Sequence, residues 1–94
     1  IKPALNLKNA EHLKAMAAIS QGAMRLCKQY GGSWSGEHGD GVARGAQNRE
    51  FWGEEMYAVF KKAKAAWDPK NIMNPNRIVD SPPVNENLRY GTQY

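Results

Sequence analysis

A carboxylate and an imidazole stand next to each other in a glycine-rich stretch near the middle of the chain. Glu37 and His38 are flanked by glycines at positions 36, 39, 41 and 45, which let backbone and ligand approach closely. Glutamate supplies the hard oxygen that divalent metals prefer, and histidine can ligate a metal or accept a proton near neutral pH. Because adjacent side chains usually cannot both face one ion, we expect Glu37 to be a metal ligand and His38 a base.

The same stretch also has a structural interpretation, which its spacing alone favours. In glycine-rich turns a histidine such as His38 often bonds to the backbone, and a glutamate such as Glu37 is solvated. Asp40 begins an ordinary Asp-Gly turn signal, and Arg44 is either an exposed charge or a clamp for a carboxylate. The stretch matches neither a phosphate loop nor the dinucleotide fingerprint, so it gives little support for nucleotide binding.

Two amphipathic helices are predicted on either side of residues 36–45. Asn9 is the expected N-cap of the first helix, which reaches about Tyr30 and ends at glycines. Glu54 is close to the start of the second helix, and Asp68 precedes a proline that should end it. The apolar faces are Leu13, Met16, Ala17, Ser20, Met24 and Cys27 in the first helix and Met56, Val59, Phe60, Ala63 and Trp67 in the second.

The first helix carries a second apolar row beside the first. This row consists of Ile19, Ala23, Leu26 and Tyr30. Such a wide stripe predicts that a larger structure covers the helix, namely a sheet that is largely absent from this chain. Exposed apolar surface of this kind should also promote self-association.

The remaining segments are predicted to lack helices. Residues 1–8 suggest an extended lead-in that could end a strand, residues 46–53 a polar linker, and residues 78–79 a brief strand-like step. No domain boundary is expected before about Asp80. We therefore predict one unit over residues 1–80 and a linker or tail over residues 81–94 that leads toward a following domain.

Charge and cysteine content restrict the possible classes of protein. The net charge of +4 comes from basic residues spread from Lys2 to Arg89 with acids among them, which argues against nucleic-acid binding. Cys27 is the single cysteine, which excludes an intrachain disulfide framework and indicates a cytoplasmic protein. No apolar run approaches the roughly 20 residues of a membrane helix, and the start at Ile1 suggests a fragment.

Several motifs together resemble one family. They are Gly31-Gly32-Ser33, then Ser35-Gly36-Glu37-His38-Gly39-Asp40-Gly41, then Ala43-Arg44, Lys64, Asp68-Pro69 and Asn74-Pro75. In order and spacing, from about Pro3 to Val79, they resemble the C-terminal domain of FAD-linked oxidases of the vanillyl-alcohol oxidase superfamily. The Gly-Asp-Gly form of the loop and the tail from Pro82 are similar to the branch fused to an iron-sulfur module.

The resemblance implies an α+β cap domain of an FAD-dependent enzyme that oxidises a 2-hydroxy acid such as D-lactate, glycolate or D-2-hydroxyglutarate. It assigns Glu37 to a divalent metal and His38 to the substrate as base, with Asn74 as a flavin contact. Arg44, as the carboxylate clamp considered above, is predicted to be a further substrate residue. The chain departs from the family's Asn-Pro-Gly-Lys turn, since Asn76 replaces the glycine and Arg77 the lysine.

The resemblance also sets expectations for the whole protein. FAD would be bound mainly by an N-terminal domain that this chain lacks, and the family's two histidine metal ligands lie upstream of it. We therefore expect the isolated chain to be inactive. In the parent, electrons would leave to an iron-sulfur module or quinone, in the cytoplasm or at the membrane periphery. The competing hypothesis is a non-catalytic helical module that docks a partner on its apolar face.

Overall fold

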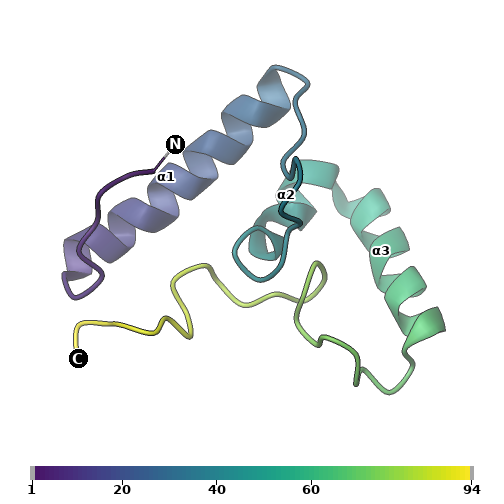
Figure 1. Ribbon diagram of the computed structural model, residues 1–94. Coiled ribbons are helices and arrows are strands. Elements are labelled where there is room, and N and C mark those ends of the chain that lie inside the picture. Colours follow the sequence, from purple (N-terminus) through teal and green to yellow (C-terminus); the bar gives the residue numbers. More distant parts are fainter. Residues whose placement is uncertain (1, 94) are drawn as a thin grey trace.

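The chain folds into helices joined by long loops. The computed structural model describes residues 2–93, and no strand occurs within that range. The elements are α1 (Ala10–Gln29), the 3-10 turn η1 (Gly45–Gln47), α2 (Asn48–Trp52) and α3 (Glu54–Trp67). Figure 1 shows α1 on one side, α2 and α3 on the other, and the C-terminal segment running back below α1. The prediction of a mostly helical piece, with two main helices on either side of a glycine-rich loop, is confirmed.

The ends of α1 follow from local hydrogen bonding. Asn9 is the N-cap, and its Oδ1 accepts hydrogen bonds from the N–H groups of Glu11 at 2.8 Å and His12 at 3.3 Å. At the other end Gly31 adopts φ 66°, and the Gly32 N–H donates to the Cys27 carbonyl at 2.8 Å. These contacts satisfy backbone groups that a helix end would otherwise leave unpaired, so both predicted boundaries are confirmed.

One side of α1 is covered and the other is open. Met24 is fully buried, whereas Ile19 and Leu26 are 43% and 57% exposed and Tyr30 is 80% exposed. The second apolar row predicted for this helix therefore faces outward. Within residues 2–93 nothing buries it, as expected for a stripe wider than these helices can cover.

The predicted polar linker is wrong, because residues 45–52 form η1 and α2. Phe51 is buried in this short helix, and its ring packs edge-on against Trp52 and stacks with Trp34. Gly53 then adopts φ 85°, which lets the chain turn directly into α3. Most of the residues before Phe51 favour helices, and its aromatic contacts hold this short helix against the core.

The buried face of α3 also differs from the prediction. Tyr57 is the buried position, and its hydroxyl accepts a hydrogen bond from the Asp80 N–H at 2.8 Å. Met56 and Val59 are 45% and 54% exposed, and Trp67 is 85% exposed. The helix therefore turns a tyrosine, rather than its most hydrophobic stripe, toward the loop that follows it.

The loop after α3 contains no strand-like step at Ile78, where φ is 69°. Val79 is buried, so the apolar pair still contributes to the core. The lead-in over residues 2–9 likewise forms no strand, and Ile1 lies outside the described residues. In the tail, Val84 and Leu88 are half-buried, and its role as a linker stays a prediction.

The molecule is more open than a self-contained domain of its length. Its radius of gyration is 14.5 Å, compared with roughly 12 Å expected for a compact domain of this size. The buried hydrophobic residues are Met24, Phe51, Tyr57 and Val79. This small core supports the view that α1 and α3 present surfaces for further protein.

Candidate functional site

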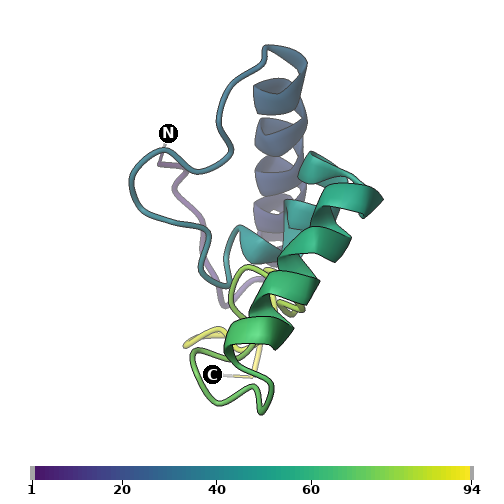
Figure 2. The same ribbon diagram turned by 90° about the vertical axis from the view of Figure 1, so that its right-hand side faces the viewer.

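Residues 36–45, which we call the glycine loop, lie in the long connection that follows α1, and Gly45 begins η1. Figure 2 shows this connection extending away from α1 before it returns to η1. Glu37 and His38 are carried on this connection, and both are exposed. The fold therefore presents the predicted carboxylate and imidazole to the outside of the chain.

Glu37 and His38 contact each other. Glu37 Oε1 lies 2.8 Å from His38 Nε2, and the two side chains are 87% and 73% exposed. An ionised carboxylate only accepts hydrogen bonds, so Nε2 carries the proton in this contact and neutral His38 has its lone pair on Nδ1. The two adjacent side chains thus meet instead of separating, while the second oxygen of Glu37 can still face an ion.

The other predicted residues of the loop support its shape. The Arg44 guanidinium donates from Nη1 to the Gly39 carbonyl at 3.0 Å, and the Arg44 N–H donates to the Asp40 carbonyl at 2.9 Å. The Asp40 carboxylate accepts from Asn48 Nδ2 at 2.9 Å. Arg44 and Asp40 therefore have structural contacts, and the donors that Arg44 does not use there suit a carboxylate ligand.

Trp34 borders the loop from the other side. Its ring is 6.5 Å from that of Phe51, and its Nε1–H donates to the Arg44 carbonyl at 3.3 Å. Trp52 packs edge-on against Phe60. The structural role predicted for these two tryptophans is confirmed, whereas the exposed Trp67 has no such role in the core of this chain.

Asn74 lies in a separate loop after α3. Asn74 and Asn76 adopt φ 45° and 60°, a region that asparagine tolerates well, so Asn76 can replace a glycine there. Asp68 orders this loop by accepting hydrogen bonds from the Ile72 and Met73 N–H groups at 2.9 and 2.8 Å. Lys64 donates to Asp68 and also to the Met73 carbonyl.

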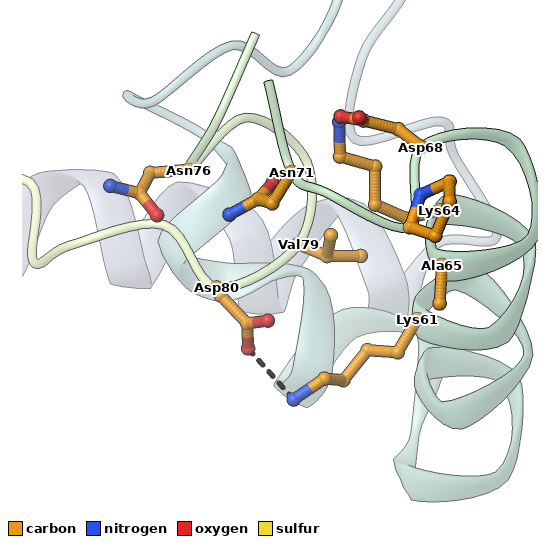
Figure 3. Close-up of a pocket in the computed structure, with 9 residues that line it drawn as sticks. Lys61, Lys64, Ala65, Asp68, Asn71, Asn76, Val79 and Asp80 are labelled. Carbon is orange, nitrogen blue, oxygen red and sulfur yellow. Dashed lines mark hydrogen bonds and ion pairs between the residues drawn. The ribbon is translucent and has the colours of Figure 1, made fainter. Parts of the chain in front are cut away.

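A cavity of about 240 Å³ lies between α3 and this loop. Lys61 Nζ lies 2.9 Å from Asp80 Oδ1. Figure 3 shows this contact, with Asn71 and Asn76 on the loop side. Each lysine that lines the cavity is paired with an aspartate. The charges are therefore balanced internally, which gives the cavity no preference for a charged ligand.

The donors for a metal ion are incomplete. No group of three or more His, Cys, Asp or Glu side chains that could hold an ion occurs within residues 2–93. Glu37 and His38 can offer at most a carboxylate oxygen and an imidazole nitrogen, which suit a divalent cation. An ion at this site would need further ligands from other protein segments.

Asn48 is the structurally important residue that sequence reasoning missed. It was assigned to a polar linker, yet it is fully buried and binds both Asp40 and the Ile78 carbonyl. Its position three residues before Phe51, on the same side of a helical turn, is the signal that could have identified it.

Over residues 2–93, no helix combines the length and apolar character that crossing a bilayer requires.

Comparison with known proteins agrees with the motifs. Residues 1–78 match the family described as FAD linked oxidases, C-terminal domain. D-2-hydroxyglutarate dehydrogenase of Escherichia coli is 40% identical over 78 residues, which cover 83% of this chain and 8% of that protein. The mitochondrial D-lactate dehydrogenase [cytochrome] of Kluyveromyces lactis is 36% identical over 70 residues, which cover 74% of this chain and 12% of that protein.

The relatives also include a protein of a different name. Alkyldihydroxyacetonephosphate synthase of Trypanosoma brucei brucei is 32% identical over 81 residues, which cover 86% of this chain and 13% of that protein. No solved structure matches the chain. The chain thus spans about a tenth of the length of such relatives, and by its family match over residues 1–78 it belongs to the C-terminal domain family of the FAD-linked oxidases.

Proposed function

We propose that this chain is the C-terminal part of a longer FAD-dependent oxidoreductase that oxidises a 2-hydroxy acid. The observation that carries the proposal is the exposed Glu37–His38 pair on the glycine loop, within a sequence similar to D-2-hydroxyglutarate and D-lactate dehydrogenases. FAD, when bound, supplies the acceptor for the hydride that leaves the substrate carbon. The residues of this chain handle the proton and the substrate's negative charge.

His38 is the proposed base. Because the Glu37 carboxylate can only accept in this contact, the proton of a neutral His38 is assigned to Nε2, and Nδ1 accepts the hydroxyl proton of the substrate. Glu37 then lies beside the imidazolium and stabilises its positive charge. Oxidation of a hydroxy acid to an oxo acid requires this proton to leave the oxygen as the hydride leaves the carbon, so both roles are needed in one step.

Glu37 is also the proposed ligand of a divalent metal. A carboxylate has two oxygens, and the contact with His38 engages Oε1. A bound divalent ion would polarise the substrate hydroxyl. The remaining ligands would come from the rest of the parent protein, because residues 2–93 offer no complete set.

Arg44 and Asn74 are proposed to contact ligands from two different loops. Arg44 uses Nη1 for the Gly39 carbonyl, and its remaining N–H donors suit the carboxylate of a 2-hydroxy acid. Asn74 is exposed on the loop that Asp68 orders, where its amide suits a flavin contact. The isolated chain is expected to be inactive, since the groups that bind FAD and complete the metal site lie elsewhere.

The rest of the parent protein is the proposed partner of the open helix faces. Ile19, Leu26 and Tyr30 on α1 form an exposed apolar row, and Trp67 ends α3 with most of its surface exposed. The iron-sulfur module or quinone that would receive the electrons, and the cytoplasmic or peripheral membrane location, are proposed on the family resemblance alone. Self-association of the isolated chain would follow from the same exposed surface.

Substitution at the pair tests the assignment in the full-length flavoprotein. His38→Gln should lower kcat at least about a hundredfold while the flavin stays bound, because a base typically contributes that much. Glu37→Gln should also reduce turnover and weaken stimulation by added divalent metal. Leu26→Ala is the matched control: unchanged turnover in both loop variants together with a loss in the control would favour the helical interaction module instead.

A further inference from the structure

Asn48 occupies a fully buried position between the glycine loop and the C-terminal segment. Its Nδ2 donates to Asp40 Oδ2 at 2.9 Å and to the Ile78 carbonyl at 3.0 Å. Because both partners are acceptors, these bonds fix the orientation of the amide. Its Oδ1 is buried and has no hydrogen-bond partner in the described part of the chain.

The residue that Asn48 holds has an unusual backbone. Ile78 is β-branched and adopts φ 69°, which is rare for such a side chain. Its N–H donates to the Gly41 carbonyl at 3.2 Å, and its own carbonyl accepts from Asn48. Both backbone groups of Ile78 are therefore tied to the loop or its anchor, and such a conformation persists only when its surroundings hold it.

The glycine loop and residues 78–81 also approach each other closely at Gly45. A Cβ at Gly45 would lie 2.1 Å from Ser81 Oγ and 3.1 Å from the Ile78 nitrogen. The end of the glycine loop is therefore in direct contact with residues 78–81. Together with the Gly41 contact, this places Asn48 at the centre of the junction between the loop and the C-terminal segment.

Glu37 and His38 have little support of their own. Both are exposed, and their side chains bond to each other. Asp40 follows His38 by two positions, and its carboxylate is held by Asn48. The location of the pair relative to the rest of the protein therefore depends on the anchors of the loop, of which Asn48 is the buried one.

We propose that Asn48 is a positioning residue: its amide joins Asp40 to the Ile78 carbonyl and thereby fixes the glycine loop so that Glu37 and His38 can act. The catalytic half of this statement rests on the proposed function. The structural half, that Asn48 holds the loop against residues 78–81, is independent of it. The two halves can be measured separately in the full-length flavoprotein.

Amide hydrogen exchange tests the structural half. Asn48→Ala should speed exchange of the Ile78 amide about tenfold or more, since its bond to the Gly41 carbonyl spans the junction. Exchange of the Arg44 amide should also rise, because its bond to the Asp40 carbonyl lies within the loop that Asn48 anchors. Asp40→Asn should change exchange little, because a carboxamide oxygen can accept the same bond from Asn48. Met24→Ala is the matched control for general destabilisation, since Met24 is also fully buried but lies in α1.

Steady-state kinetics test the catalytic half. Asn48→Ala should lower kcat by about tenfold to a hundredfold with KM changed much less, because a misplaced base loses rate more than binding. Asp40→Asn should keep most of the activity, because it keeps the acceptor for Asn48. If the negative charge of Asp40 were itself required, this variant would lose activity. Met24→Ala should lower the unfolding temperature, but it should not lower kcat much more than it changes KM.

Three results would overturn the proposal. The first is an exchange rate of the Ile78 amide in Asn48→Ala that equals the rate in the unsubstituted protein. The second is an equally large increase of that rate in Met24→Ala. The third is faster exchange with unchanged kcat. If the unsubstituted flavoprotein oxidises no 2-hydroxy acid, the proposed function fails and the catalytic half fails with it, while exchange still decides whether Asn48 anchors the loop.

Discussion

Lys64 Nζ lies 2.6 Å from Asp68 Oδ2 at the end of α3. The Asp68 carboxylate is buried and accepts hydrogen bonds from the N–H groups of Ile72 and Met73. The hydrogen bond from Lys64, followed by those from the backbone, holds the pKa of Asp68 below its ordinary value. Asp68 therefore links helix α3 to the loop that carries Asn74.

This linkage predicts a pH-dependent effect of Asp68→Asn. A carboxyl whose pKa is depressed in the folded state contributes stability above its unfolded pKa of about 3.9, and loses it as the pH falls through the lower folded value. Asp68→Asn should therefore lower the Tm at pH 7, and the difference from the unsubstituted protein should shrink below about pH 4. Thermal unfolding monitored by circular dichroism measures both.

The exposed pair of Lys61 and Asp80 provides the control for that experiment. Asp80→Asn breaks a contact of 2.9 Å between side chains that are 45% and 58% exposed, so it should change Tm little. A Tm difference for Asp68→Asn that stayed constant down to pH 2 would contradict the role of the ionised carboxylate.

Tyr57→Phe should destabilise the protein through one hydrogen bond. The Tyr57 hydroxyl accepts from the Asp80 N–H at 2.8 Å, and Tyr57 is 6% exposed. Loss of this acceptor should lower the free energy of unfolding by about 1 kcal/mol, with larger values if the amide stays buried. Urea unfolding measures the change. Tyr30→Phe, at a position that is 80% exposed, should have no measurable effect, and equal changes in both variants would refute the assignment.

Gly45→Ala should separate the glycine loop from residues 78–81. The added Cβ would meet Ser81 Oγ at 2.1 Å, and the nearby Ile78 nitrogen belongs to the backbone and cannot rotate away. We expect a loss of about 1–3 kcal/mol in the free energy of unfolding, with partial rescue when Ser81→Gly is added. Gly36→Ala is the control, since nothing lies within 4 Å of a Cβ there. A neutral Gly45→Ala would show that the close approach is not needed.

The sequence predicted the parts of the fold that local rules decide. Asn9 caps α1 and Gly31 ends it, as side-chain capping and a left-handed glycine require. The wide apolar stripe on α1 correctly indicated a face that residues 2–93 leave uncovered, as the exposure of Leu26 shows. Each of these features depends on neighbours within a few positions.

The parts that were missed depend on contacts between distant segments. The helix over residues 48–52 includes Arg49 and Glu50, which favour helices, but its place in the fold depends on the packing of Phe51 with Trp34. Tyr57 is buried and accepts a hydrogen bond from the Asp80 N–H, a contact across 23 positions that the apolar pattern of α3 does not indicate. The contact between Asn48 and Ile78 spans 30 positions, so periodicity could not indicate it.

The candidate site was predicted as a set of residues but not as an arrangement. Glu37 and His38 were singled out from their types and from the family resemblance, and the structure brings them to 2.8 Å of each other. Their catalytic and metal-binding roles stay predictions. Arg44 and Asp40 proved to support the loop, which hydrogen-bond geometry shows and residue spacing does not.

The central claim is that this chain belongs to a flavoprotein that oxidises 2-hydroxy acids. The most direct measurement is the absorbance spectrum of the full-length protein before and after anaerobic addition of D-2-hydroxyglutarate, D-lactate and glycolate in turn. We predict a bound flavin whose visible absorbance is lost with at least one of these acids. A protein purified without flavin, or a flavin that none of them reduces, would contradict the claim.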